Sequence, residues 1–278
     1  MDARLPELLL RDKEPARKLS RKHHCSRSTL YRRSRLAFDH RIAMPNELLL
    51  PPDQTLVLIV DGLRFRFDGQ PWTLYDLAVK PAQESYAWFL DPVLRAGAES
   101  ATIWRQVIDD IPAEVTGRVR ALVADGMRGI KEVAQECDWV YQRCHYHIWA
   151  LLQQWFDLRG PGSLDASIKQ AVRDILLSAD EEQAARARWT IANHLDKNSS
   201  GADWTLRQLL RDWPAVRAHL DYPHLGIPRT TSAVESMHSL IRTVVDRVNT
   251  PSAVYRRALT FIRVRPTITC NGSGSQQN

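Results

Sequence analysis

Two aspartates share a sequence setting that is typical of a metal site. Asp61 ends the apolar run of "LVLIVDG" and Asp125 ends that of "ALVADGMRG", and a glycine follows each of them. Carboxylates at the ends of neighbouring strands meet at one edge of a sheet, where two like charges need a cation to neutralise them. Hard oxygen ligands suit Mg²⁺ or Mn²⁺. With a third carboxylate, two such ions about 3.5–4 Å apart drive in-line displacement at a phosphodiester.

Each acid also has a purely structural interpretation. Asp61-Gly62 fits a hairpin turn, and Asp125-Gly126 fits a strand-to-helix turn. The candidate third acid, Glu235, lies in "TTSAVESMHSLIR", where Ser232 and Glu235 fit the S-x-x-E capping box at the start of a helix. The residues alone leave both interpretations of Glu235 open.

The segment "RCHYHIW" raises the question of zinc. Cys144 and His147 have C-x-x-H spacing, but no second ligand pair accompanies them, and a structural zinc needs about four ligands. We therefore expect a buried cysteine and a hydrogen-bonded histidine just past a strand. His238 follows Glu235 by three positions, but this half of a di-iron pattern has no second copy. The sequence also lacks the common phosphate-loop, dinucleotide-binding and nucleophile-elbow motifs.

The positive charge of the chain is concentrated at its start. The net charge is +6, and residues 1–41 hold 12 Lys/Arg against 5 Asp/Glu, so the remainder is nearly neutral. A basic head on a neutral body is the electrostatic pattern of a nucleic-acid-binding protein.

Three short helices are predicted in this head, with a second helix over residues 16–23, an "HHCS" turn and a third helix over residues 28–36. We interpret residues 1–44 as a small helix-turn-helix. A hydroxyl-rich helix start followed by arginines suits a recognition helix. The candidate DNA-binding residues are Arg27, Ser28, Thr29, Tyr31, Arg32, Arg33 and Arg35.

The main domain is predicted to be α/β, with a mixed sheet of three antiparallel strands followed by two parallel ones. Strands are expected over residues 56–60, 63–67 and 72–79, with turns at Asp61-Gly62 and Asp68-Gly69. Helices are expected over 84–94 and 100–111, then strands over 119–125 and 139–144, separated by a short helix and followed by a helix over 148–155. Right-handed crossovers place the later strands parallel to the first.

The second half of the chain is predicted to be helical. Residues 160–225 form an all-helical insertion, whose tryptophans we interpret as core, and helices over 232–248 and 252–262 close the domain. The expected division is a head (1–44), a first core part (53–159), the insertion (160–225), the closing core helices (226–265) and a tail (266–278) whose end is disordered.

Composition favours a soluble globular protein. Of the 278 residues 44% are hydrophobic and 25% charged, no run approaches the roughly 20 apolar residues that span a bilayer, and no signal-peptide core is present. Four cysteines do not make a disulfide framework. We expect a reduced, cytoplasmic protein without membrane partners.

Four motifs in order, "LIVDGLRFRF", "LVADGMRGI", "RCHYHIW" and "TTSAVESMHSLIR", resemble the Mutator-type bacterial insertion-sequence transposases. The closing "RPTITCNG" resembles a variant branch of that family, and the resemblance covers roughly residues 53–272. It implies a ribonuclease-H-like core with three acidic ligands and a helical insertion before the last of them. By motif, Asp61, Asp125 and Glu235 match these acids, and Cys144 and His147 match a C-x-x-H motif near the site.

The implied activity is Mg²⁺- or Mn²⁺-dependent cleavage of element ends and strand transfer into target DNA, with two ions and a homodimer on paired ends, in a prokaryotic cytoplasm at the nucleoid. We then expect Glu235 to be a metal ligand, with Ser232 capping the helix independently. The head departs from the family, because only Cys25 remains of its zinc-ligand cysteines, which indicates a shortened head. A DNA-binding remnant without catalysis and a ribonuclease-H-like nuclease without transposition are the alternatives.

Overall fold

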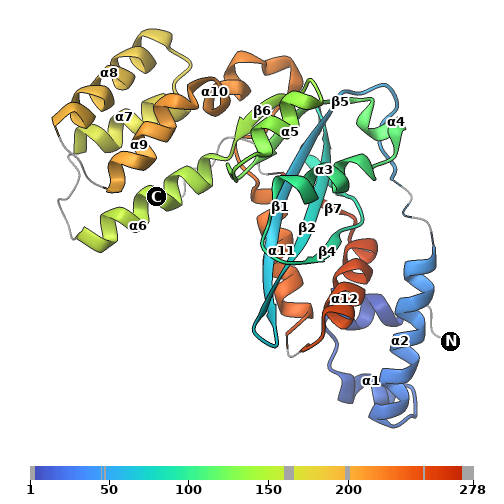
Figure 1. Cartoon of the computed structure of the whole chain (residues 1–278). Coiled ribbons are helices and arrows are strands. Elements are labelled where there is room, and N and C mark those ends of the chain that lie inside the picture. Colours follow the sequence, from blue (N-terminus) through green and yellow to red (C-terminus); the bar gives the residue numbers. More distant parts are fainter. Residues whose placement is uncertain are drawn as a thin grey trace.

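A seven-stranded mixed sheet forms the centre of the computed structural model, which describes residues 4–44, 46, 48–159, 166–197, 201–246 and 248–270 (Figure 1). The order is β6-β5-β1-β2-β3-β7, and β4 also pairs with β2. The β1–β5 and β5–β6 pairs are parallel, and the other pairs are antiparallel. The strands are β1 (Leu56–Phe67), β2 (Gln70–Pro81), β3 (Tyr86–Phe89), β4 (Val93–Ala96), β5 (Val119–Ala124), β6 (Val140–Arg143) and β7 (Thr267–Thr269).

Helices cover both faces of this sheet, because successive side chains of a strand point to opposite faces. On one face Ile59 and Leu63 belong to the same core as residues of α11 (Ser232–Val244) and α12 (Pro251–Val264). On the other face Leu58 and Val60 pack in a core with residues of α3 (Ala101–Asp109), α4 (Ala113–Thr116) and α5 (Ile130–Glu136). The chain is therefore a mixed α/β protein with flanking helices.

The predicted turn at Asp61-Gly62 is wrong. β1 runs unbroken from Leu56 to Phe67, and its ladder with β2 pairs every residue, Asp61 with Asp76 and Gly62 with Tyr75. The other Asp-Gly pair does form the hairpin, since Asp68 and Gly69 have positive φ angles of 48° and 77°. Strand-forming residues on both sides of Asp61-Gly62 keep this pair in extended conformation. The two strands predicted over residues 56–60 and 63–67 are therefore a single strand.

The predicted helix over residues 84–94 is also wrong, because this segment forms β3 and the start of β4. Tyr86 and Trp88 are strand-forming residues, and the Asp91-Pro92 pair separates the two short strands. The third antiparallel strand of the sheet is therefore β3. The strand β7 pairs with β3 inside the predicted tail, and the expected disorder of residues 271–278 lies outside the described residues.

The described residues between the core strands and α11 form helices. These are α6 (His145–Arg159), α7 (Ala166–Leu177), α8 (Glu181–Lys197), α9 (Gly201–Arg211) and α10 (Trp213–Asp221), followed by a 3₁₀ turn at Pro223–Leu225. They have a core of their own, which includes Leu152, Ile191 and Leu206, and they extend to one side of the sheet (Figure 1). The interpretation of the tryptophans as core is wrong for Trp189 and Trp204, which are 69% and 58% exposed.

The head contains a short helix (Glu7–Arg11), α1 (Ala16–Lys22) and α2 (Arg27–Ala43), which begins one residue earlier and ends seven later than predicted. Ser26 caps α2 by accepting a hydrogen bond from the Thr29 N–H. The head packs on α12, with an ion pair between Asp39 and Arg256, N to O 2.7 Å (Figure 1). Within the described residues, no helix is both long and apolar enough to cross a membrane.

Candidate metal centre

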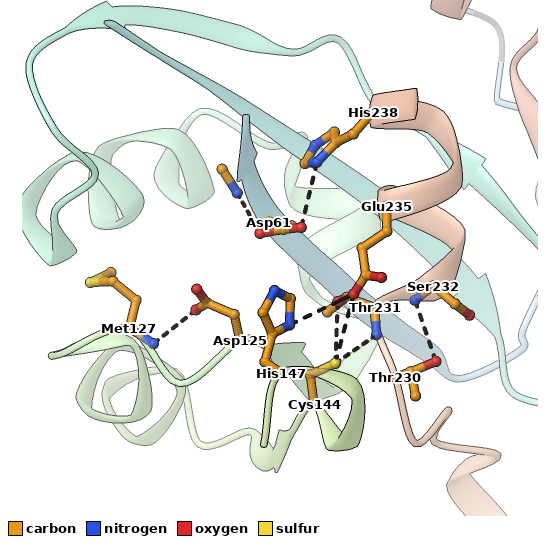
Figure 2. Close-up of polar contacts among 11 residues, drawn as sticks. Asp61, Asp125, Met127, Cys144, His147, Thr230, Thr231, Ser232, Glu235 and His238 are labelled. Atoms are coloured by element: carbon orange, nitrogen blue, oxygen red, sulfur yellow. Dashed lines mark hydrogen bonds and ion pairs between the residues drawn. The ribbon is translucent and has the colours of Figure 1, made fainter. Parts of the chain in front are cut away.

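Asp61 and Asp125 both line one pocket of about 650 Å³. Ile59 of β1 pairs in parallel register with Val123 of β5, and each aspartate follows two positions later, on the same face of the sheet. Ligand atoms of Asp61, Asp125 and His147 all lie within 4.8 Å of one another. Neighbouring parallel strands thus bring together the two acids that the sequence singled out (Figure 2).

Backbone N–H groups hold one oxygen of each aspartate. The Gly62 N–H donates to Asp61 Oδ1 at 2.9 Å, and the Met127 N–H donates to Asp125 Oδ1 at 2.8 Å. The loop after Asp125 turns at Gly126, whose φ of 93° favours glycine and where an added Cβ would lie 2.6 Å from Arg143 Nε. The glycine after Asp125 is therefore required by the path of the backbone.

A fourth carboxylate, Glu99, lines the same pocket and was missed by the sequence analysis. It precedes α3, and its Oε1 accepts a hydrogen bond of 2.8 Å from Trp104 Nε1. Burial together with the Asp125 and Asp61 carboxylates raises the pKa of Glu99 to about 7. Burial also raises the pKa of Asp61 to about 6, against the opposing effect of His238 and His147. Several carboxylates therefore lie close together in the pocket, and a bound cation would relieve their mutual repulsion.

Gly62 makes room for Glu99, because an added Cβ would lie 2.8 Å from the Glu99 carboxylate. We expect Gly62→Ala to displace the end of the Glu99 side chain and break its hydrogen bond to Trp104, which lowers the free energy of unfolding by about 0.5–1.5 kcal/mol. Urea denaturation measures this change. In the Glu99→Ala background the same glycine substitution should cost much less, and an equal cost in both backgrounds would contradict the contact.

Glu235 reaches the pocket from the first turn of α11, and its partners are not those of a capping box. Its Oε1 accepts a hydrogen bond of 2.6 Å from Thr231 Oγ1, lies 3.9 Å from Cys144 Sγ and lies 3.6 Å from His147 Nδ1 (Figure 2). The helix begins after Thr231, so Ser232 is already its first residue and no side chain caps it. The expectation that Ser232 caps α11 is therefore wrong.

Cys144 and His147 lie next to Glu235, and His147 also lies next to the two aspartates. Cys144 is fully buried, and its Sγ accepts a hydrogen bond of 3.3 Å from the Thr231 N–H. The same sulfur lies 3.3 Å from the Thr231 hydroxyl oxygen, whose proton is donated to Glu235. Although burial lowers the pKa of His147, the Cys144 sulfur and the Asp61 and Asp125 carboxylates outweigh it and raise the pKa to about 9. Ligand atoms of Cys144, His147 and Glu235 also lie within 4.8 Å of one another, so His147 stands between the two groups.

Two further groups lie beside Asp61: His238, which the sequence did not assign to the site, and Asp76, which it did not single out. His238 of α11 has its Nδ1 3.5 Å from Asp61 Oδ2 (Figure 2). Its Nε2 lies 2.9 Å from Asp76 Oδ2. Asp76 and Asp61 raise the pKa of His238 against the effect of its burial. The E-x-x-H spacing was the available signal, because it places His238 and Glu235 on one face of the helix.

The rim of the pocket carries cations and an aromatic side chain. Arg64, Arg242 and Tyr146 line it, and all three are exposed. Neither arginine has an ion-pair partner among the described residues, so both are available to an anionic ligand.

The seven candidate DNA-binding residues lie on α2, away from this pocket. Thr29 is half-buried and bonded to the Ser26 hydroxyl, and the other six are exposed. Arg27, Arg32, Arg33 and Arg35 have no ion-pair partner within the described part of the chain. The helix therefore presents a cationic surface.

Comparisons with known proteins do not place this chain in a family. No family model and no curated protein matches it. A chain of the simian T-cell lymphotropic virus intasome in complex with the PP2A regulatory subunit B56 gamma is similar at 11% identity and a TM-score of 0.25, over 59% of this chain and 69% of that one. The NurA structure with manganese is similar at 14% identity and a TM-score of 0.16, over 86% and 64%. Scores this low carry no information on the fold or chemistry of this chain.

Proposed function

We propose that this chain is a DNA transposase of the Mutator type, with a ribonuclease-H-like core, that cleaves element ends and transfers the strand into target DNA. The supporting observation is that Asp61 of β1, Asp125 after β5 and Glu235 of α11 line one open pocket, although they are far apart in the sequence. The sequence motifs that resemble the family supply the identity of the reaction.

The residues present fit a divalent cation. Asp61 and Asp125 would hold it together with Glu235, and ring nitrogens of His147 lie within 4.8 Å of ligand atoms of all three. Oxygen ligands favour Mg²⁺ or Mn²⁺ over softer metals. When bound, such an ion activates the attacking oxygen and stabilises the leaving oxygen of a phosphodiester.

Backbone and side-chain groups of the protein have the other roles in this proposal. The Gly62 and Met127 N–H groups fix one oxygen of each aspartate and so orient the other. Arg64 and Arg242 on the rim bind the phosphates that flank the scissile bond. The exposed arginines of α2 bind the DNA backbone outside the pocket, and a homodimer would hold two element ends together.

Strand joining tests this function against its nearest alternative. Purified protein is incubated with Mn²⁺, supercoiled plasmid and labelled oligonucleotides that carry candidate end sequences with a free 3′ hydroxyl. We expect labelled DNA to become covalently joined to the plasmid. Cutting without any joining would favour a nuclease, and binding without cutting would favour a non-catalytic remnant.

The head supplies a second test. We expect Arg32→Glu with Arg33→Glu to weaken binding to all DNA sequences and to flatten its salt dependence, by about 0.9 in the log–log slope for each phosphate that the variant no longer neutralises. Fluorescence anisotropy over a salt series measures both quantities. The same reversal at Arg186 of α8, which is paired with Glu182, is the control. An unchanged slope in the α2 variant would show that the phosphates bind elsewhere on the protein.

A further inference from the structure

Asp76 is a fully buried carboxylate in the middle of β2. On the same face of this strand its neighbours are the apolar Leu74 and Ala78, which belong to the core under α11 and α12. Its ion-pair partner among the described residues is His238, with Nε2 to Oδ2 2.9 Å. Burying a carboxylate costs several kcal/mol unless a partner compensates it, so the position calls for an explanation.

Asp76 also lies directly opposite Asp61 in the antiparallel β1–β2 ladder. Like charges at directly opposed positions destabilise a sheet. The imidazole of His238 lies between the two, with Nδ1 3.5 Å from Asp61 Oδ2 and Nε2 toward Asp76. His238 therefore contacts both Asp61, which lines the pocket, and Asp76, which is fully buried in the core.

We propose that Asp76 and His238 are positioning residues that fix the Asp61 carboxylate for metal binding, which rests on the function proposed above. Asp76 holds the imidazole through Nε2, and the imidazole holds Asp61 Oδ2 through Nδ1. The Gly62 N–H holds the other oxygen of Asp61, so both oxygens have a defined place. Groups that orient a ligand in this way are worth a large part of the metal affinity of a site.

Stability alone does not account for the pair. Buried ion pairs replaced by apolar side chains of similar volume are often neutral or stabilising. At position 76, between Leu74 and Ala78 and beneath α11, an apolar residue would extend the existing row. The side chain that contacts Asp76 is the one that contacts Asp61, so orientation of Asp61 is the role that fits the placement.

Two substitutions of His238 separate its interactions with the two carboxylates. A glutamine amide nitrogen takes approximately the place of Nε2, so His238→Gln keeps the polar contact with Asp76 and removes the one with Asp61. An asparagine amide nitrogen takes approximately the place of Nδ1, so His238→Asn does the reverse. Asp76→Asn removes the buried charge with little change of shape. The control is His145→Gln, at a buried histidine whose Nε2 lies 2.7 Å from the Val216 carbonyl, outside the pocket.

The measurement is a titration of each full-length variant with Mn²⁺ alone, followed by electron paramagnetic resonance, beside its thermal midpoint. We expect His238→Gln and Asp76→Asn to raise the Kd about 10–100-fold, the typical effect of losing an orienting group. His238→Asn should bind Mn²⁺ better than His238→Gln although it is less stable, and His145→Gln should bind as the wild type does. The double variant Asp76→Asn/His238→Gln should bind no more weakly than the weaker single variant.

Mn²⁺ affinity that stays unchanged in Asp76→Asn and His238→Gln, or that follows only the thermal midpoint, would overturn the positioning role. A wild type that binds no Mn²⁺ would overturn it together with the metal centre. Weakened binding in the variants of a wild type that neither nicks nor joins DNA would support the positioning role and contradict the transposase. The two proposals therefore fail separately.

Discussion

Glu235→Gln is expected to lower metal-dependent cleavage of DNA by about 10²–10³-fold, because in the proposed site it removes the charge of a metal ligand and with it several kcal/mol of stabilisation. Glutamine has the shape of glutamate and can still accept a hydrogen bond from Thr231 Oγ1, so the fold should persist. Initial rates of nicking of supercoiled plasmid measure the effect. DNA affinity in EDTA should change little, since the cationic surface of α2 is untouched.

Ser232→Ala is the matched control for this substitution. Ser232 lines the same pocket and lies on the same helix, but its side chain does not cap α11. Its backbone N–H lies 3.3 Å from Thr230 Oγ1, and this hydrogen bond survives the change to alanine. We expect nearly wild-type nicking. Full activity in Glu235→Gln would remove Glu235 from the site and leave the hydrogen bond to Thr231 as its role.

Asp212→Ala is expected to lower the free energy of unfolding by about 3–5 kcal/mol, the usual cost of removing one partner of a buried ion pair. Asp212 Oδ2 lies 2.9 Å from Nη1 of the buried Arg143, and this pair joins the start of α10 to the end of β6. Without the carboxylate the Arg143 charge is left buried and unpaired. Urea denaturation followed by circular dichroism measures the loss of stability.

Arg211 and a double substitution serve as controls for Asp212. Arg211 is a second partner of Asp212 but is 68% exposed in its side chain, so Arg211→Ala should cost less than about 1 kcal/mol. Replacing both members of the buried pair, Arg143→Met with Asp212→Leu, should recover much of the stability that Asp212→Ala removes. If Asp212→Ala costs no more than Arg211→Ala, the pair does not join β6 to α10 as described.

The sequence predicted the sheet best where strands are apolar on both faces. The apolar runs over residues 56–60 and 119–125 predicted buried strands, and the parallel pairing of β1 with β5 places Asp61 beside Asp125. Short segments were less predictable. The spacing of residues 84–94 fits a helix as well as it fits two short strands, and pairing of β3 and β4 with β2, which decides between them, is a tertiary interaction.

The wrong prediction of a turn at Asp61-Gly62 left Asp76 out of the candidate site. A hairpin at Asp61-Gly62 would end the strand there, whereas the hairpin at Asp68-Gly69 continues the ladder and places Asp76 opposite Asp61. His238 then joins them through the packing of α11 on β1 and β2. Glu99 was beyond prediction for a similar reason. It does not end an apolar run in the sequence, and it enters the pocket from the loop between β4 and α3, where Gly62 leaves room for it.

The most direct test of the metal-dependent cleavage is nicking of supercoiled plasmid by the purified chain with Mn²⁺, for the wild type beside Asp125→Asn and Asp68→Asn. Asp68 stands in the other Asp-Gly pair, in the exposed turn between β1 and β2, and is the control for removal of a carboxylate. We expect nicking by the wild type and by Asp68→Asn, and we expect it to disappear with EDTA and in Asp125→Asn. Equal nicking by Asp125→Asn, or none by the wild type while it still binds DNA, would contradict a metal-dependent site at Asp125.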